Sequence, residues 1–167
     1  HRKVHLFDID IPGKIKFKES DTISPGSSIT TFNVNEFTVG LGICYDIRFP
    51  EQAHIMRDQG AHIMIYPGAF NMTTGPVYFE LLNRARAVDN QVYCSSIAPA
   101  TDNTATYTSW GHSLVCAPTG VVVDSALHDE QIVYCDMSMT EIQDIRDGIP
   151  TSKQKRSDIY KLVHVLK

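Results

Sequence analysis

The 167-residue sequence lacks the patterns that mark metal sites, membrane-spanning helices and nucleic-acid-binding surfaces. Its four cysteines form no C-x-x-C pair and no two histidines have H-E-x-x-H spacing, so we expect no metal ion and no other cofactor. No apolar run approaches the roughly 18 residues of a transmembrane helix. The net charge is −4, without a cluster of lysine and arginine. This argues against a nucleic acid or an anionic membrane as a partner.

The composition and length fit one globular domain. Apolar residues make up 43% of the sequence and charged residues 20%, which is ordinary for a globular protein. Neither a repeat nor a low-complexity linker divides the chain, so we expect a single domain over residues 1–167. Strand-like segments interspersed with helical patterns predict an α/β fold. The strands are expected at residues 2–7, 29–34, 38–43, 62–66, 91–97, 113–117, 120–124 and 131–136.

Three helices are predicted from proline, glycine and capping signals. The first begins at Pro50 and ends before Gly60. The third follows a capping box at residues 138–141 and ends before Pro150. The second begins near Pro76 and carries an apolar stripe at helical spacing, with Arg84 and Arg86 pointing elsewhere. The stripe consists of Val77, Leu81, Ala85 and Val88.

Cys44 is the strongest candidate for a catalytic residue. It lies between a strand-like run that contains two glycines, residues 39–43, and the helix that begins at Pro50. A thiol at such a turn is close to backbone N–H groups, which lower its pKa and can bind a developing oxyanion. The alternative is a cysteine that only packs. We expect that packing role for Cys94, Cys116 and Cys135, which fall in strand-like runs.

Long motifs support the catalytic interpretation of Cys44. They are residues 2–13 (RKVHLFDIDIPG), 17–20 (FKES), 40–51 (GLGICYDIRFPE), 66–76 (YPGAFNMTTGP), 84–93 (RARAVDNQVY) and 154–160 (QKRSDIY). Together they resemble the nitrilase superfamily of carbon–nitrogen hydrolases along almost the whole chain, most closely its omega-amidase branch. The resemblance implies a four-layer αββα sandwich, to which this chain contributes the C-terminal portion with one sheet and part of the other. It also implies a homodimer that packs through helix layers.

The same resemblance implies the catalytic groups. The family combines a Cys nucleophile, a Lys and a general-base Glu. Cys44 and Lys3 match the first two, whereas the Glu is expected upstream of His1. We therefore expect an N-terminally incomplete enzyme that is inactive by itself. Lys3 would pair with the tetrahedral oxygen, Glu19 would position Lys3, and the backbone N–H of Tyr45 would be a second oxyanion donor. The alternative for Lys3 and Glu19 is a solvated surface position.

Three further residues are candidates for substrate binding. Phe70 and Thr74, in the loop after the strand that ends at residue 66, would line the pocket. Arg48, four residues after Cys44, would pair bidentately with a substrate carboxylate. His112 is expected to be structural, because the family uses Glu and Lys instead. The alternative for the arginine is an ion pair with Asp46, Glu51 or Asp89.

The resemblance implies a thiol amidase that hydrolyses the terminal amide of a small dicarboxylic acid monoamide, alpha-ketoglutaramate or alpha-ketosuccinamate. The reaction would pass through a Cys44 thioester and release ammonia and a 2-oxo acid. Two alternatives stay open: a deaminated-glutathione amidase of the same superfamily, and an inactive truncated module that associates with a full-length subunit. Thiol chemistry favours the reducing cytoplasm, with the mitochondrion as a second compartment. The basic tail, residues 151–167, is expected to pack on a partner subunit.

Overall fold

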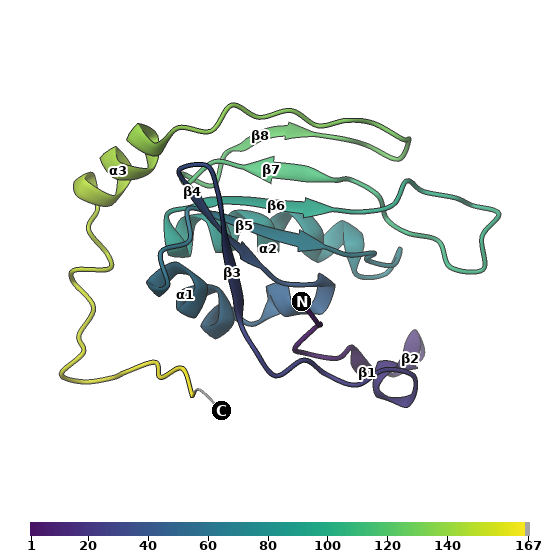
Figure 1. The fold of residues 1–167 in the computed structure, drawn as a ribbon. Helices are drawn as coiled ribbons and strands as arrows, with labels where there is room; N and C mark the ends of the chain where they lie inside the picture. The colour runs from purple at the N-terminus through teal and green to yellow at the C-terminus, as the bar shows by residue number, and fades with distance from the viewer. Residues whose placement is uncertain (166–167) are drawn as a thin grey trace.

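The computed structural model describes residues 1–165. A six-stranded sheet runs through it in the order β3-β4-β5-β6-β7-β8 (Figure 1). The β4–β5 and β5–β6 pairs are parallel and the other pairs are antiparallel. The strands are β3 (Thr30–Val34), β4 (Phe37–Leu41), β5 (Ile63–Pro67), β6 (Tyr93–Ile97), β7 (Leu114–Cys116) and β8 (Val122–Ser125). A separate hairpin pairs β1 (Asp8–Ile11) with β2 (Ile15–Lys18).

Two helices, α1 (Pro50–Asp58) and α2 (Gly75–Asn90), connect the parallel strands and pack into the main core (Figure 1). α1 begins with Pro50 at its first turn and buries Ala53 and Met56 against Met64 and Tyr66 of β5. Parallel strands require such crossover helices. Because β4, β5 and β6 are parallel, the loops that follow them emerge at the same edge of the sheet. That edge carries the Cys44 turn. The α/β class is confirmed.

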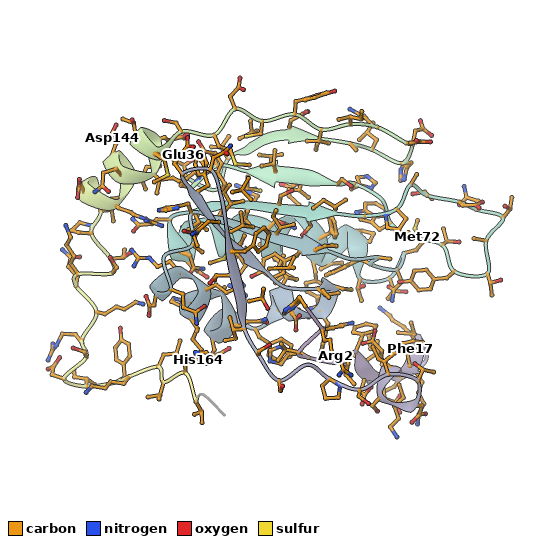
Figure 2. All side chains as sticks on the ribbon, viewed as in Figure 1. Arg2, Phe17, Glu36, Met72, Asp144 and His164 are labelled. Carbon is orange, nitrogen blue, oxygen red and sulfur yellow. The ribbon has the colours of Figure 1, made fainter. Side chains whose placement is uncertain are left out.

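A smaller core forms where α3 (Met139–Gly148) docks on the sheet. Ser138 caps this helix as predicted, because its hydroxyl accepts a hydrogen bond from the backbone N–H of Glu141. Ile142 is buried in that core, and the Tyr93 hydroxyl bonds both to the Glu141 carboxylate and to the backbone N–H of Ser138. Figure 2 shows α3, marked by Asp144, far from the hairpin. No helix within residues 1–165 is both long and apolar enough to cross a membrane.

Two of the predicted strands, residues 2–7 and 131–136, are irregular instead, so these predictions are wrong. The backbone N–H groups of Val4 and His5 donate to the carboxylate of Asp46, not to a neighbouring strand. In the second segment, the backbone N–H of Tyr134 donates to the side chain of Asp124. Side-chain acceptors satisfy these backbone donors, so no strand ladder is needed.

The apolar stripe of α2 faces away from the sheet. Val77, Leu81 and Val88 are 56%, 59% and 51% exposed. Arg86, expected to point elsewhere, is buried, and its Nε donates to the carbonyl of Ile47 at 2.8 Å. The buried side of α2 thus contains polar residues. Arg86 bonds to a neighbouring element, whereas the side-chain amides of Asn83 and Asn90 donate to carbonyls one turn earlier in α2 itself. The side of the helix that the stripe predicted to be buried is therefore the exposed one.

The tail after α3 runs along the side of the molecule towards α1 (Figure 1). Lys155 pairs with Asp58 at 3.5 Å, and the side chains of Gln59 and His164 bond at 3.4 Å. Several apolar side chains of the tail stay exposed, such as Val163 at 68%. Leu166 and Lys167, which end the predicted tail, lie outside the described residues.

Candidate active site

Cys44 begins a short 3-10 helix, η2 (Cys44–Arg48), between β4 and α1. Its φ of 49° is in the left-handed region, which side chains other than glycine rarely adopt. Glycines make this sharp turn possible. A Cβ at Gly42 would lie 2.5 Å from the Tyr66 ring, and a Cβ at Gly68 would lie 2.6 Å from Cα and Cβ of Cys44. Gly68 therefore lets the chain pass directly beside Cys44, and Gly42 leaves room for the Tyr66 ring two residues before it.

A cavity of about 620 Å³ opens over the Cys44 turn. Its walls come from the N-terminal stretch, the hairpin, η2, the loop after β5 and the loop after β6. All of the predicted site residues lie in its lining: Lys3, Glu19, Cys44, Tyr45, Arg48, Phe70 and Thr74. Lys16, Asn71 and Tyr107 also line it and were not predicted. Segments far apart in the sequence thus converge on one pocket.

Lys3 and Glu19 form a close ion pair at the cavity. The Nζ of Lys3 lies 2.6 Å from Oε2 of Glu19, and only 8% of the lysine side chain is exposed. The same carboxylate oxygen accepts the backbone N–H of Phe7 at 2.7 Å. One oxygen of the Glu19 carboxylate therefore contacts both Lys3 and the backbone of Phe7.

The Cys44 thiol has a raised pKa, whereas the sequence predicted a lowered one. Burial is the largest cause, because it penalises the thiolate. The charge of Lys3 and the backbone N–H groups of Ala69 and Tyr45 act in the opposite direction, while the Glu19 carboxylate adds to the increase. The lysine charge and the N–H groups that were expected to lower the pKa are present, but burial raises the pKa by more than they lower it.

Arg48 lies among three aromatic rings. Its Cζ is 4.5 Å from the centre of the Tyr78 ring, 5.6 Å from that of Phe70 and 5.9 Å from that of Tyr45. These are distances at which a guanidinium is attracted to a ring face. Among residues 1–165 it forms no ion pair, although Asp46, Glu51 and Asp89 were considered as partners.

Asp46 is a residue whose importance sequence reasoning missed. Its carboxylate is fully buried. One oxygen accepts the backbone N–H and the ring Nδ1 of His5, both at 2.8 Å. The other accepts the N–H of Ile43 at 2.9 Å and that of Val4 at 3.3 Å. Asp46 therefore ties the segment that carries the lysine to the turn that carries the cysteine. Its place three residues after Ile43 is a capping position that could have identified it.

Thr74 and Phe70 occupy the loop between β5 and α2. The Thr74 hydroxyl donates to Oδ1 of Asn71 at 3.0 Å, and the backbone N–H groups of Thr73 and Thr74 donate to the same oxygen. Asn71 thus fixes the loop by a local side-chain turn. Phe70 packs edge-on against Phe79 of α2. Thr74 is thus held by Asn71 and Phe70 by Phe79.

His112, Cys94 and Cys116, which were expected to be structural, do not line this cavity. His112 stacks on Trp110, with ring centres 4.0 Å apart, and lines a different, smaller cavity. Cys94 and Cys116 are fully buried on facing positions of β6 and β7, and burial raises the pKa of Cys116 to about 12. Over residues 1–165, no group of three or more His, Cys, Asp or Glu side chains could hold a metal ion.

Comparison with known proteins agrees with this geometry. The family model described as "Carbon-nitrogen hydrolase" matches residues 1–147. The chain belongs to the carbon–nitrogen hydrolase family. It is similar to the proteins named omega-amidase NIT2 from Danio rerio (54% identical over 162 residues, 97% of this chain and 58% of that protein) and Homo sapiens (54% over 160 residues, 96% and 58%). This carbon–nitrogen hydrolase chain thus spans less than two thirds of the length of these curated relatives.

Solved structures extend the likeness to the fold. Saccharomyces cerevisiae Nit3, described as a member of branch 10 of the nitrilase superfamily, matches with a TM-score of 0.83 and 44% identity over 93% of this chain and 54% of that one. The C. elegans NitFhit protein matches with a TM-score of 0.90 and 34% identity over 97% of this chain and 40% of that one. The carbon–nitrogen hydrolase chain therefore has a nitrilase-superfamily fold.

Proposed function

We propose that the protein acts as a thiol amidase of the omega-amidase type, which hydrolyses the terminal amide of a small dicarboxylic acid monoamide. Alpha-ketoglutaramate and alpha-ketosuccinamate are the proposed substrates. Two relatives at 54% identity bear the name omega-amidase. The supporting geometry is a cavity that brings a cysteine, a buried lysine and an arginine together.

In the proposed reaction, the Cys44 thiolate attacks the amide carbon, and a C–S bond forms while the carbonyl π electrons move to oxygen. The ammonium of Lys3 and the backbone N–H of Tyr45 stabilise that oxyanion. Collapse of the intermediate breaks the C–N bond, and the nitrogen leaves as ammonia after it receives the proton that the Cys44 thiol gave up on becoming a thiolate. Water then cleaves the thioester, which gives the carboxylic acid and restores the thiol. Glu19 keeps Lys3 in place throughout.

The proposed substrate class, an amide that also bears a carboxylate, rests on the surroundings of Arg48. Its guanidinium lines the Cys44 cavity, rests on aromatic rings and has no ion-pair partner among residues 1–165. A positive charge that is left unpaired beside apolar surface favours an anionic ligand, and a guanidinium matches a carboxylate bidentately. The proposed substrates have one carboxylate at the end opposite the amide, so Arg48 and Cys44 would hold the two ends.

Arg48→Lys tests this proposal in the active enzyme that contains this chain. We expect kcat/KM for alpha-ketoglutaramate to fall about ten- to a hundredfold, because the bidentate contact is lost. For pentanamide, which lacks the carboxylate, the change should stay within about threefold. Released ammonia is the measured product. Arg84→Lys is the matched control, since Arg84 is an exposed arginine of α2 paired with Glu80.

Equal losses for the two amides would remove Arg48 from substrate recognition. Ammonia release that survives Cys44→Ala would overturn the thiol mechanism itself. The two outcomes are separable, because the first concerns selectivity and the second the nucleophile.

We also propose a homodimer. The support is the apolar stripe of α2, whose side chains Val77, Leu81 and Val88 are exposed on one helix, since exposed apolar surface can mark a site of protein–protein contact. The tail, residues 151–167, is proposed to lie on the partner, in line with its exposed apolar side chains. A sedimentation measurement that gives only monomer at micromolar concentration would contradict this proposal.

We propose a cytoplasmic location, with mitochondria as the second compartment. Cys44 must stay a free thiol to react, and the cytoplasm keeps cysteines reduced.

A further inference from the structure

The loop between β6 and β7 closes one side of the Cys44 cavity and is attached to the loop after β5. The backbone N–H of Trp110 donates to the carbonyl of Phe70 at 2.7 Å, and Ser109 forms a bridge with Asn71. Two residues earlier, the Tyr107 hydroxyl donates to the carbonyl of Ala69 at 2.8 Å. Three contacts in a row thus join residues 107–110 to residues 69–71, and Tyr107 forms the one nearest to Gly68.

Ala69 lies beside the nucleophile. Its neighbour Gly68 has no side chain at a point where a Cβ would lie 2.6 Å from Cα and Cβ of Cys44, so residues 68–69 run directly against the cysteine. The backbone N–H of Ala69 lowers the pKa of the Cys44 thiol, against the larger effect of burial, and so favours the thiolate. Ala69 thus directly follows the residue that lies against Cys44, and its carbonyl accepts the hydrogen bond from Tyr107.

We propose that Tyr107 is a positioning residue for Cys44, which acts by holding Ala69 against the sulfur. A hydrogen bond to the carbonyl restricts rotation of the Ala69 backbone. Without it, the N–H can turn away from the thiol, and a thiolate that loses a donor is less stable. The tyrosine ring lines the cavity, but the hydroxyl is the part that transmits the restraint. This role depends on the reactivity of Cys44 and not on which amide is the substrate.

Other groups also act on the thiol, and they must stay constant in a test. Lys3 and Glu19 influence it from the N-terminal stretch and η1 (Glu19–Asp21). Arg48 lines the cavity from η2 and Lys16 from β2. Tyr107→Phe removes one hydroxyl, leaves all four charges in place and keeps the ring that forms the wall.

The test is the rate of Cys44 alkylation by iodoacetamide as a function of pH, followed by mass mapping of each cysteine in the full chain. In Tyr107→Phe we expect the midpoint for Cys44 to rise by about half a unit to one unit, and the rate at neutral pH to fall about three- to tenfold. Cys135 in the same sample is the internal reference. Tyr134→Phe, at a tyrosine that is 74% exposed, is the matched control and should leave the Cys44 midpoint unchanged.

A shift confined to Cys44 in the Tyr107 variant supports the proposal. An unchanged midpoint overturns it, and so does an equal change at Cys135, which would indicate general loosening. Thermal unfolding identifies a variant that fails to fold. In that case hydrogen–deuterium exchange of residues 68–70 in Tyr107→Trp, which also lacks the hydroxyl, decides: faster exchange supports the proposal and unchanged exchange overturns it.

Discussion

Asp46→Asn should lower the free energy of unfolding more than an Asp→Asn change on the surface, because the carboxylate is fully buried and accepts four hydrogen bonds. In asparagine, one acceptor oxygen becomes an NH₂ group that faces two donors. Each buried donor left without a partner costs about 1–3 kcal/mol. We therefore expect the free energy of unfolding to fall by about 2–6 kcal/mol, a large share of the roughly 5–15 kcal/mol of a typical domain.

Urea unfolding monitored by circular dichroism measures this loss. Asp10→Asn is the control, because Asp10 pairs with Lys16 on the surface with 61% and 79% of the two side chains exposed. Such pairs contribute at most about 1 kcal/mol. If the Asp46 variant lost no more than the Asp10 variant, the buried carboxylate would not join the two segments, and our account of how Lys3 reaches the site would be refuted.

Two more predictions concern the cysteine itself. Gly68→Ala should destabilise the chain by about 1–3 kcal/mol and slow Cys44 alkylation, because the new Cβ would lie 2.6 Å from Cα and Cβ of the cysteine. Gly148→Ala is the control and should do neither, since its Cβ meets nothing within 4 Å. Equal urea midpoints for the two variants would contradict this prediction. Lys3→Met should move the Cys44 alkylation midpoint to higher pH, since the lysine charge lowers the thiol pKa: the rate falls at neutral pH and recovers at high pH. An unmoved midpoint would indicate that Glu19 already cancels the charge.

Local signals predicted the elements that depend on local causes. The helix starts at Pro50 and Ser138 follow from proline and capping chemistry. Residues 2–7, in contrast, alternate like a strand, yet their backbone donors are satisfied by Asp46, about forty residues away. The stripe of α2 is a regular helical pattern, but periodicity does not tell which face of a helix meets the core.

The site residues also fall into two groups, those that local motifs predict and those whose role depends on contacts distant in the sequence. Residues within recognisable motifs, such as Lys3, Cys44 and Arg48, were predicted and line one cavity. Asp46 and Tyr107 were missed as site residues because their roles are long-range hydrogen bonds: Tyr107 contacts a residue 38 positions away. No pattern of neighbouring residues encodes the Tyr107 contact, and at Asp46 only the bond to Ile43 is local. The pKa direction of Cys44 was wrong for a related reason, since burial is a property of the assembled chain.

The backbone of Cys44 has a consequence for the balance between stability and reactivity. At a φ of 49° the chain favours glycine at this position, and a side chain there costs about 1–3 kcal/mol. The fold nevertheless presents a sulfur at that point. A reactive group is thus displayed by a conformation that the chain would not adopt by itself, and the tightly packed neighbours of the turn must supply the free energy that keeps it there.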